Sequence, residues 1–323
     1  MLKLHVFAWM FSVAMIFLNT DVVSGQNYPN KPIRLITSGA GGAGDSTSRL
    51  IAESLSRTLG QSVLVENRAG ASGIIAAQTV TKAPPDGYTL LVYGATIWLL
   101  PFLQDNVPYD PVKDFSPIAV LTIAPSVIVV HPSVPVKTVK ELIALAKARP
   151  GELNYGSAGP GSISHLATEL FKARAGVNLA HVPYKSAAQS HSDLMSGQIQ
   201  LSFPTAGPVI PYVKSQRLRA LAVTSAKRSE MLPEVPTVVA SGLPGYVWET
   251  ISGIFAPAQT PEAIIIRLNQ EIVRVLNRAD VKEKFLKNGV ETVGSSPEVF
   301  AAKIKSDMAT VGKVIKDVGI RAE

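Results

Sequence analysis

The chain has 323 residues, a hydrophobic content of 46% and a formal net charge of +7 at pH 7. A chain of this length buries a large core and forms about two domains, and its composition excludes wholesale disorder. The absence of cysteine excludes disulfides, thiolate metal sites and cysteine nucleophiles. The positive charge favours an anionic partner. Because the Lys and Arg residues are scattered, without a basic run interleaved with aromatics, we expect a small acidic solute and no nucleic acid.

The N-terminus has the features of an export signal. A short basic start, residues 1–5, precedes an apolar run over residues 6–18 that is too short to span a bilayer comfortably. We expect residues 1–25 to be a signal peptide that is cleaved after Gly25. The alternative is an uncleaved membrane anchor. Since no later stretch is long and apolar enough to span, we expect a protein that is soluble in the periplasm after cleavage.

A glycine-rich turn over residues 39–44 follows the first predicted strand. Apolar residues 35–36 predict a buried strand, and a helical pattern begins after the turn and runs through residues 50–55. A strand, a small-residue turn and a helix aim several backbone N–H groups at one point, where the helix dipole adds positive potential. Hydroxyls at residues 46–48 add donors in the first helical turn. The turn is therefore suited to bind an anion.

Three ligands and one alternative without a ligand compete for this turn. Gly39, Gly41 and Gly44 have the spacing of a dinucleotide fingerprint, with Glu66 near the place of a ribose-binding acid. A phosphate loop is excluded because Asp45 stands where its lysine belongs. A carboxylate or other small anion held on backbone amides, and a tight turn that binds nothing, both remain open. We expect Asp45 to order its own turn or to meet a ligand donor through water.

The first hundred residues alternate strand and helix, which predicts a parallel sheet. The further elements are a strand at residues 62–66, a helix at 74–82 and a strand at 88–93. Ligands of such sheets bind beyond the carboxyl ends of the strands. Three predicted turns share this position: residues 41–45, 68–72 and 94–96.

A second small-residue turn, over residues 156–162, repeats the first in physical type. It follows a strand at residues 153–155 and precedes a helix that runs to Phe171. Two anion-competent helix N-termini that lie far apart in sequence indicate two domains that each contribute one, as a clamp for a solute with acid groups. The alternative is that Ser162 only caps its helix.

The rest of the chain supplies further strands and helices of both domains. Residues 101–117 read as a proline-rich connection, and residues 204–207 as a turn after a strand at 198–203. Residues 248–256 predict a long strand that crosses back to the first domain. The other predicted elements are strands at 118–122, 126–130, 180–185 and 218–224, and helices at 140–149, at 190–196, after Pro261, at 281–288 and at 297–318.

Catalytic and metal motifs are missing from the sequence. Neither an HExxH nor a GxSxG pattern occurs, and His131, His165, His181 and His191 have no metal-ligand spacing. Ser157 with His165 would be a nucleophile and a base only if they faced each other, and we expect His165 to pack beside the loop instead. We therefore expect no enzyme, no catalytic residue, no metal and no cofactor.

Short motifs spread from Tyr28 to about Ile320 resemble the periplasmic solute receptors of tripartite tricarboxylate transporters, often called the Bug family. The motifs, in chain order, are Tyr28-Pro-x-Lys-Pro-Ile-Arg, Gly41-Gly-x-x-Asp45, Leu59-Gly-Gln, Val65-Glu-Asn-Arg68, Pro85-Asp-Gly-Tyr-Thr-Leu90, Tyr109-Asp-Pro-x-Lys-Asp-Phe115, Gly159-x-Gly-Ser162, His181-Val-Pro-Tyr-Lys185, Leu218-Arg-Ala-Leu-Ala-Val-Thr224 and Gly253-x-Phe-Ala-Pro257. One such motif would be unspecific, whereas this many in order are specific.

The resemblance implies an α/β fold with two lobes, the periplasmic binding protein fold of type II topology, in which mixed sheets flanked by helices enclose an interdomain cleft. Domain 1 would comprise residues 26–125 plus 250–323, and domain 2 residues 126–249. The implied function is capture of a small organic carboxylate by hinge closure and delivery to the subunits of a cognate membrane transporter, by a monomer. The alternatives are a secreted hydrolase that uses Ser157 or Ser162, and a solute sensor for a signalling partner.

The resemblance also implies a set of ligand-binding residues. They are Ser38, Gly41, Gly42, Asp45, Gly94, Ala95, Thr96, Ser157, Gly161, Ser162, Lys185 and Thr205. The sequence departs from the family pattern at residues 37–40, where prolines and an aromatic residue are usual, and at Ser186, where glycine is usual. Loss of the aromatic wall leaves a roomier and more polar first turn. The identity of the carboxylate is therefore left open.

Overall fold

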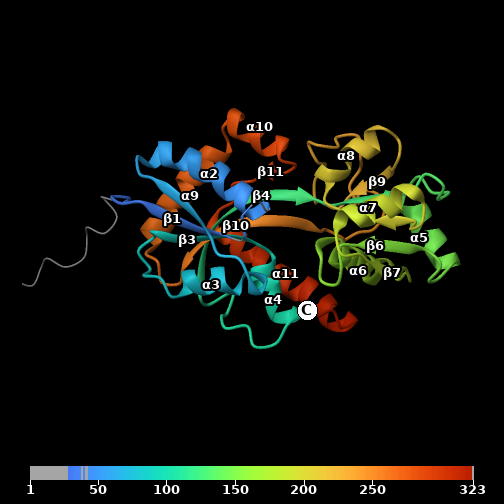
Figure 1. The fold of residues 1–323 in the computed structure, drawn as a ribbon, viewed down its shortest axis with the longest axis horizontal. Helices are drawn as coiled ribbons and strands as arrows, with labels where there is room; N and C mark the ends of the chain where they lie inside the picture. Colours follow the sequence, from blue (N-terminus) through green and yellow to red (C-terminus); the bar gives the residue numbers. More distant parts are fainter. Residues whose placement is uncertain (1–27, 38, 41–42, 322–323) are drawn as a thin grey trace, which may run out of the picture.

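The structure is a computed structural model that describes residues 28–37, 39–40 and 43–321. The predicted signal peptide lies outside these residues. The molecule is elongated, with one β-sheet near each end of its long axis (Figure 1). We call the six-stranded sheet with its helices the first lobe, and the five-stranded sheet with its helices the second lobe. The predicted arrangement of two lobes with mixed sheets flanked by helices is confirmed.

The sheet of the first lobe contains both parallel and antiparallel strands. Its spatial order is β11 (Glu291–Thr292), β4 (Phe115–Pro125), β10 (Glu249–Pro257), β3 (Thr89–Gly94), β1 (Ile33–Thr37) and β2 (Val63–Asn67). Strand β1 pairs in parallel with both β2 and β3, so the predicted parallel opening is confirmed. Strand β10 runs antiparallel between β3 and β4, as expected of the long strand that returns from the second lobe.

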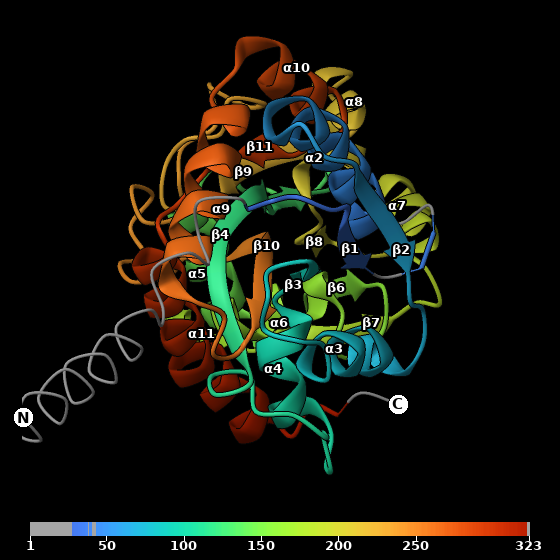
Figure 2. The same ribbon diagram turned by 90° about the vertical axis from the view of Figure 1, so that its left-hand side faces the viewer.

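Helices cover both faces of the first sheet (Figure 2). The helices are α2 (Ala43–Leu59), α3 (Ile74–Thr81), α4 (Thr96–Leu103), α9 (Glu262–Leu276), α10 (Ala279–Lys287) and α11 (Pro297–Val318), with a 3₁₀ turn η1 (Ala71–Gly73). The apolar stripe of α9, which includes Leu268 and Ile272, is fully buried against one face. Each such side chain contributes about 1.5–3 kcal/mol through burial. The 3.6-residue period of apolar residues, which predicted this helix, therefore also determines which face of the helix packs against the sheet.

The second lobe repeats the strand order of the first. Its sheet runs β7 (Ala180–Pro183), β6 (Asn154–Ser157), β8 (Leu201–Ser202), β5 (Val127–Val130) and β9 (Arg219–Val223). Its helices are α5 (Val139–Ala148), α6 (Ile163–Ala175), α7 (Ala187–Ser196) and α8 (Ala206–Lys214). In each lobe the strand that arrives from the other lobe, β10 or β5, is inserted antiparallel inside the sheet.

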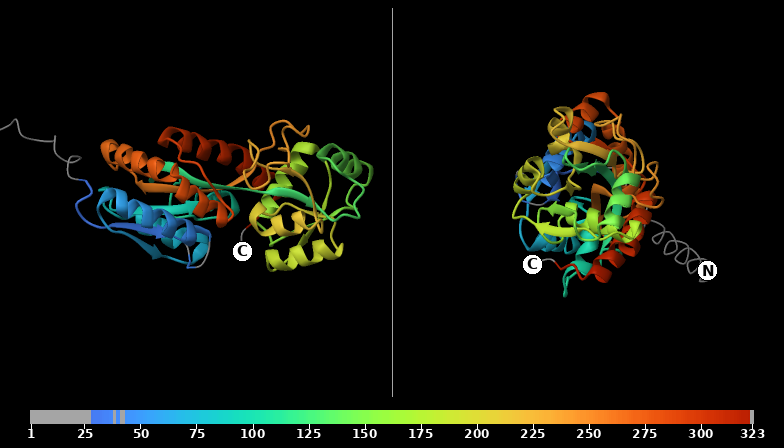
Figure 3. Two further views of the ribbon diagram at one scale, coloured as in Figure 1. Left: turned by 90° about the horizontal axis from the view of Figure 1, so that it is seen from above. Right: turned by 90° about the vertical axis from the view of Figure 1, so that its right-hand side faces the viewer.

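Two extended segments pass between the lobes (Figure 3). One buried threonine, Thr224, joins them. The first runs from β4 into β5 through Ser126, and the second runs through Trp248 into β10. The Thr224 hydroxyl accepts from the backbone N–H of Ser126 at 3.0 Å and lies 2.6 Å from the carbonyl oxygen of Trp248. The contact extends the pairing of β4 with β10, which reaches Pro125 and Glu249, so the two crossings lie side by side.

Two helices lie where the sequence predicted none. The expected proline-rich connection begins with α4, which contains Pro101, and the expected turn at residues 204–207 opens α8, which contains Pro211. A proline inside a helix lacks an N–H and leaves a carbonyl unpaired one turn earlier. In α4 the Tyr109 hydroxyl donates to that carbonyl, the one of Ile97, at 2.9 Å. The hydrogen bond from Tyr109 thus offsets the free-energy cost of the carbonyl that Pro101 leaves unpaired.

Among the described residues, no helix combines the length and the apolar character needed to cross a bilayer.

Candidate functional site

A cleft lies between the two lobes, as the resemblance implied. Three cavities of about 780, 260 and 650 Å³ adjoin one another, and we call them the wide, the narrow and the second-lobe cavity. Ile163 lines all three, Gly94 lines the wide and the narrow cavity, and Thr205 lines the wide and the second-lobe cavity. Residues of both lobes thus line three neighbouring cavities.

The wide cavity has a floor that belongs to the first sheet. Ser252 on β10 pairs with Thr122 on β4 and with Gly94 on β3, and all three residues line the cavity. The opposite wall is α8 of the second lobe, which contributes Lys214, while Lys287 lines the cavity from α10. Each lobe thus contributes one lysine to this cavity, and Lys287 is also paired with Glu283 at 2.7 Å.

The first loop leads into α2, and Asp45 in the first turn of this helix is bound to side chains of its own lobe. Its carboxylate accepts from the Asn67 amide at 2.8 Å and lies 3.0 Å from Arg49 Nε. Asp45 is 5% exposed and is not among the residues that line the three cavities, whereas Gly44 beside it lines two of them. The predicted residues Ser38, Gly41 and Gly42 lie outside the described residues.

Glu66, the candidate ribose-binding acid, is engaged elsewhere. It accepts two hydrogen bonds from the Arg34 guanidinium, at 2.6 and 2.9 Å, and lies 3.4 Å from Arg68. The hydrogen bonding with Arg34 holds the pKa of the Glu66 carboxyl below its usual value. A carboxylate paired in this way is a poor partner for ribose hydroxyls, which speaks against the dinucleotide interpretation.

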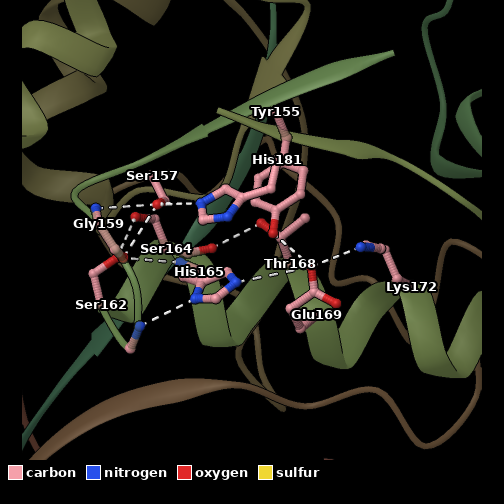
Figure 4. Close-up of polar contacts among 11 residues, drawn as sticks. Tyr155, Ser157, Gly159, Ser162, Ser164, His165, Thr168, Glu169, Lys172 and His181 are labelled. Carbon is pink, nitrogen blue, oxygen red and sulfur yellow. Dashed lines mark hydrogen bonds and ion pairs between the residues drawn. The ribbon is translucent and has the colours of Figure 1, made fainter. Parts of the chain in front are cut away.

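The second loop, residues 157–162, ends at α6 and lies over a polar cluster (Figure 4). Ser162 caps α6, because its Oγ accepts from the backbone N–H of His165 at 3.4 Å. Gly161 has a positive φ of 72° and lines the narrow and second-lobe cavities. Ser157 is completely buried beneath the loop, where its Oγ accepts from the backbone N–H of Gly159 at 3.1 Å.

The partner of Ser157 is His181, which the sequence did not single out. Ser157 Oγ lies 2.7 Å from His181 Nε2, while His165 packs beside the loop as expected. Tyr155 and His181 are register partners of the parallel strands β6 and β7, which brings Ser157 and His181 onto neighbouring positions. Burial, with the adjacent His165 ring, lowers the pKa of His181 to about 4. Within the described part of the chain, no carboxylate hydrogen-bonds His181, so the contact lacks the third member of a hydrolase triad.

Of the remaining predicted residues, three line the cavities and one does not. Ala95 and Thr96, at the start of α4, line the narrow cavity, and Ser162 lines the second-lobe cavity. Lys185 is exposed in the bend between β7 and α7 and lines none of the three cavities.

Three cavity-lining residues near the second crossing were missed. Trp248, Thr250 and Ser252 stand at alternate positions, and their polar atoms Nε1, Oγ1 and Oγ are buried without a hydrogen-bond partner in the described structure. A buried donor without a partner costs about 1–3 kcal/mol, so such groups are usually satisfied. Polar residues at a two-residue period within an otherwise apolar strand were the signal in the sequence.

The narrow cavity is otherwise mainly apolar. Leu99 and Leu103 of α4 line it together with Ile163 and Leu166 of α6. Within the described residues, no group of three or more His, Cys, Asp and Glu side chains is placed to hold a metal ion. Glu249 also lines the narrow cavity, and its carboxylate accepts from the backbone N–H of Ala226 at 3.1 Å. The cleft therefore combines apolar walls with a small number of polar and charged groups, which suits a small organic molecule.

The sequence and the structure match known proteins along most of the chain. The profile of the Tripartite tricarboxylate transporter family receptor matches residues 47–320. A relative from Pseudomonas sp. (strain P51), the UPF0065 protein in the tcbD-tcbE intergenic region, is 37% identical over 313 residues, which cover 96% of this chain and 93% of the relative.

Solved structures agree with this match. The R. palustris protein Rpa4515 with adipate has a TM-score of 0.72 and 37% identity, covering 91% of this chain and 99% of the other. A TctC solute binding protein from Polaromonas, with no ligand, has a TM-score of 0.83 and 29% identity, covering 90% and 99%. The chain therefore belongs to the tripartite tricarboxylate transporter family of receptors.

Proposed function

We propose that this receptor captures a small organic carboxylate in the cleft between its lobes and delivers it to a membrane transporter. The observation that carries the proposal is that the N-terminal ends of α2 and α6, one from each lobe, meet at the same narrow cavity, which Gly44 and Gly161 both line. Helix N-termini bind anions through free backbone N–H groups and the helix dipole. The adipate-bound relative supports a carboxylate as the ligand.

The charge of the chain agrees with an anionic ligand. The net charge of +7 attracts anions in general. Lys214 of the second lobe adds positive charge at the wide cavity, whereas the charge of Lys287 is paired with Glu283 at 2.7 Å. The unpartnered groups of Trp248 and Thr250 at the narrow cavity and of Ser252 at the wide cavity supply further donors for polar groups of the ligand. A carboxylate with an apolar body and a second polar group fits these walls best.

Hinge closure is the proposed mechanism. The ligand binds one lobe first, and the closed form gains stability because the donors of the other lobe then find a partner. Domain boundaries at residues 125/126 and 249/250 would place the hinge at the crossings that Thr224 joins.

The proposed location is the periplasm, after removal of residues 1–25, and the proposed state is a monomer without cofactor, metal or catalytic activity. The family supports a receptor rather than an enzyme. Sensing of the solute for a signalling partner would use the same cleft and the same closure.

A thermal-shift panel on residues 26–323 tests the proposal. We expect mono- and dicarboxylates to raise the melting temperature, because a ligand at about 100 times its Kd adds about 2.7 kcal/mol of stability. The matched controls are the neutral amides of the same acids, which should give no shift. Shifts with sugars or cations but with no carboxylate would contradict the proposal, and ester turnover that Ser157→Ala abolishes would favour the hydrolase.

A further inference from the structure

Two histidines beneath the second loop form a stacked pair. The rings of His165 on α6 and His181 on β7 lie 4.2 Å apart with an interplanar angle of 8°. The Tyr155 ring stacks on His181 at 4.8 Å and 14° (Figure 4). We call His165 and His181 the histidine pair. The three stacked rings come from three secondary-structure elements, α6, β7 and β6, so tertiary packing fixes the geometry of the pair.

Each histidine contacts a different end of the loop. The backbone N–H of Gly161 donates to His165 Nδ1 at 3.0 Å, and Ser157 Oγ lies 2.7 Å from His181 Nε2. Because a backbone N–H only donates, Nδ1 of His165 must be unprotonated, and the ring proton is on Nε2. The conformation of the loop at Gly161, which has a positive φ, therefore depends on the His165 tautomer that has its proton on Nε2.

The charged groups around the pair are already engaged with one another. Glu169 accepts from the Tyr155 hydroxyl at 2.5 Å and from Lys172 at 2.7 Å, and lies 4.0 Å from His165 Nε2. Burial lowers the pKa of both histidines, Glu169 partly opposes this effect, and Lys172 adds to it. A second proton on either ring would also place a positive charge against the other ring, 4.2 Å away. The pair is therefore neutral when the loop has this shape.

The same contact decides which amides remain for a ligand. Gly161 uses its N–H on His165, and the N–H of His165 binds Ser162 Oγ. In the described structure, no hydrogen bond uses the backbone N–H of Ile163 or Ser164, the first two residues of α6. These two amides are the donors left at the helix N-terminus.

We propose that His165, supported by His181, is a positioning residue of the second binding loop, whose unprotonated Nδ1 fixes Gly161 so that the first amides of α6 receive the carboxylate. The inference rests on the proposed function. It adds that ligand affinity depends on the protonation of His165: a second proton would set an N–H against the N–H of Gly161 and release the loop.

The test compares His165→Asn with His165→Phe. An asparagine side chain offers an amide oxygen near the place of Nδ1, whereas phenylalanine keeps a flat ring for stacking but has no acceptor. By isothermal titration at pH 7.5, with the carboxylate that gives the largest thermal shift, we expect Asn to keep the wild-type Kd within about threefold. Loss of the acceptor in Phe should weaken binding about tenfold, as for an unpaired buried amide.

The pH profile distinguishes positioning from a merely structural role. The wild-type affinity should fall more steeply than that of His165→Asn as the pH decreases from 7.5 to 5, because asparagine does not titrate and protonation of the ligand is common to both. His181→Gln, which keeps an acceptor near Nε2, should bind like the wild type at pH 7.5.

Each outcome decides one of the two claims. If the wild type binds no carboxylate, the proposed function fails. If the wild type binds and His165→Phe has the same Kd, the inference is overturned. If His165→Phe does not fold, as judged by circular dichroism, the wild type and His165→Asn still test the inference. Equal pH profiles of their affinities would overturn it, and a steeper wild-type profile would support it.

Discussion

The two loops that meet at the cleft belong to similar strand–turn–helix units, yet the protein supports them in different ways. Beneath the first loop, Asp45 is buried but its ionic partner Arg49 has a side chain that is 57% exposed. Beneath the second, Glu169 and the histidine pair form a network that is buried or half-buried. Exposed ion pairs are weak and screened by salt, whereas buried hydrogen-bond networks rigidify a site. The difference indicates that the ion pair of Asp45 with Arg49 contributes less stability than the network around Glu169.

The largest effect is expected from Glu169→Ala. This change leaves the Tyr155 hydroxyl and the Lys172 ammonium without their partner in a buried place, and should lower the free energy of unfolding by about 3 kcal/mol. Urea denaturation monitored by circular dichroism measures it. The matched control is Glu283→Ala, which removes an exposed pair with Lys287 and should leave the free energy of unfolding unchanged. Equal effects of the two changes would remove the distinction between buried and exposed support.

Asp45→Ala comes next. It removes the acceptor of Asn67 and the partner of Arg49, so we expect the carboxylate Kd to rise about tenfold, or 1.4 kcal/mol. The unliganded chain should lose about 1 kcal/mol or less. Titration calorimetry and denaturation give the two numbers, with Glu53→Ala on the same helix as the control that leaves both unchanged. A larger loss of stability than of affinity would make Asp45 a structural residue.

Ser252→Ala should change affinity without lowering stability. Its Oγ is buried and unpartnered in the described structure, so its removal should alter the unfolding free energy by about 0.5 kcal/mol or less. If the hydroxyl meets the ligand, the Kd should rise about threefold to tenfold. Ser126→Ala is the matched control, since its Oγ is also unpartnered but Ser126 lines none of the three cavities. Equal Kd values for both variants would remove Ser252 from the site.

The smallest effect is a pH dependence of stability. The folded chain keeps His181 neutral down to a pKa of about 4, whereas in the unfolded chain it takes up a proton below about pH 6.5. The unfolded state therefore binds more protons, and the free energy of unfolding should fall as the pH decreases from 6.5 towards 4. Urea denaturation at pH 7 and pH 5 measures the fall, which should be smaller for His181→Gln. An identical fall in both chains would show that other groups cause it.

Much of the fold could be predicted from local patterns, because strand and helix periods are set by neighbouring residues. The parallel opening and the crossing strand β10 were predicted correctly. Helices α4 and α8 were missed because Pro101 and Pro211 read as helix breakers, and only a tertiary contact such as that of Tyr109 with Ile97 compensates for the missing N–H.

The candidate site was predictable where it rests on loops and less so where it rests on pairing between strands. The glycine turns carried a signal in their composition, and Gly94, Gly161 and Thr205 do line the cleft. The contact of Ser157 with His181 depends on the register of β6 against β7, which a single sequence does not contain. The unpartnered hydroxyls of β10 share one face of the strand. That this face lines the cleft could be recognised only once the order of the strands in the sheet was known.

The most direct test of the account is an amide NMR titration of residues 26–323 with the carboxylate that gives the largest thermal shift. If one anion is shared by both lobes, the backbone amide signals of Gly44 in the first lobe and of Ile163 and Ser164 in the second should all shift with a single Kd. Shifts confined to the amides of one lobe, or to residues outside the cleft, would contradict the claim that the two helix N-termini share one ligand.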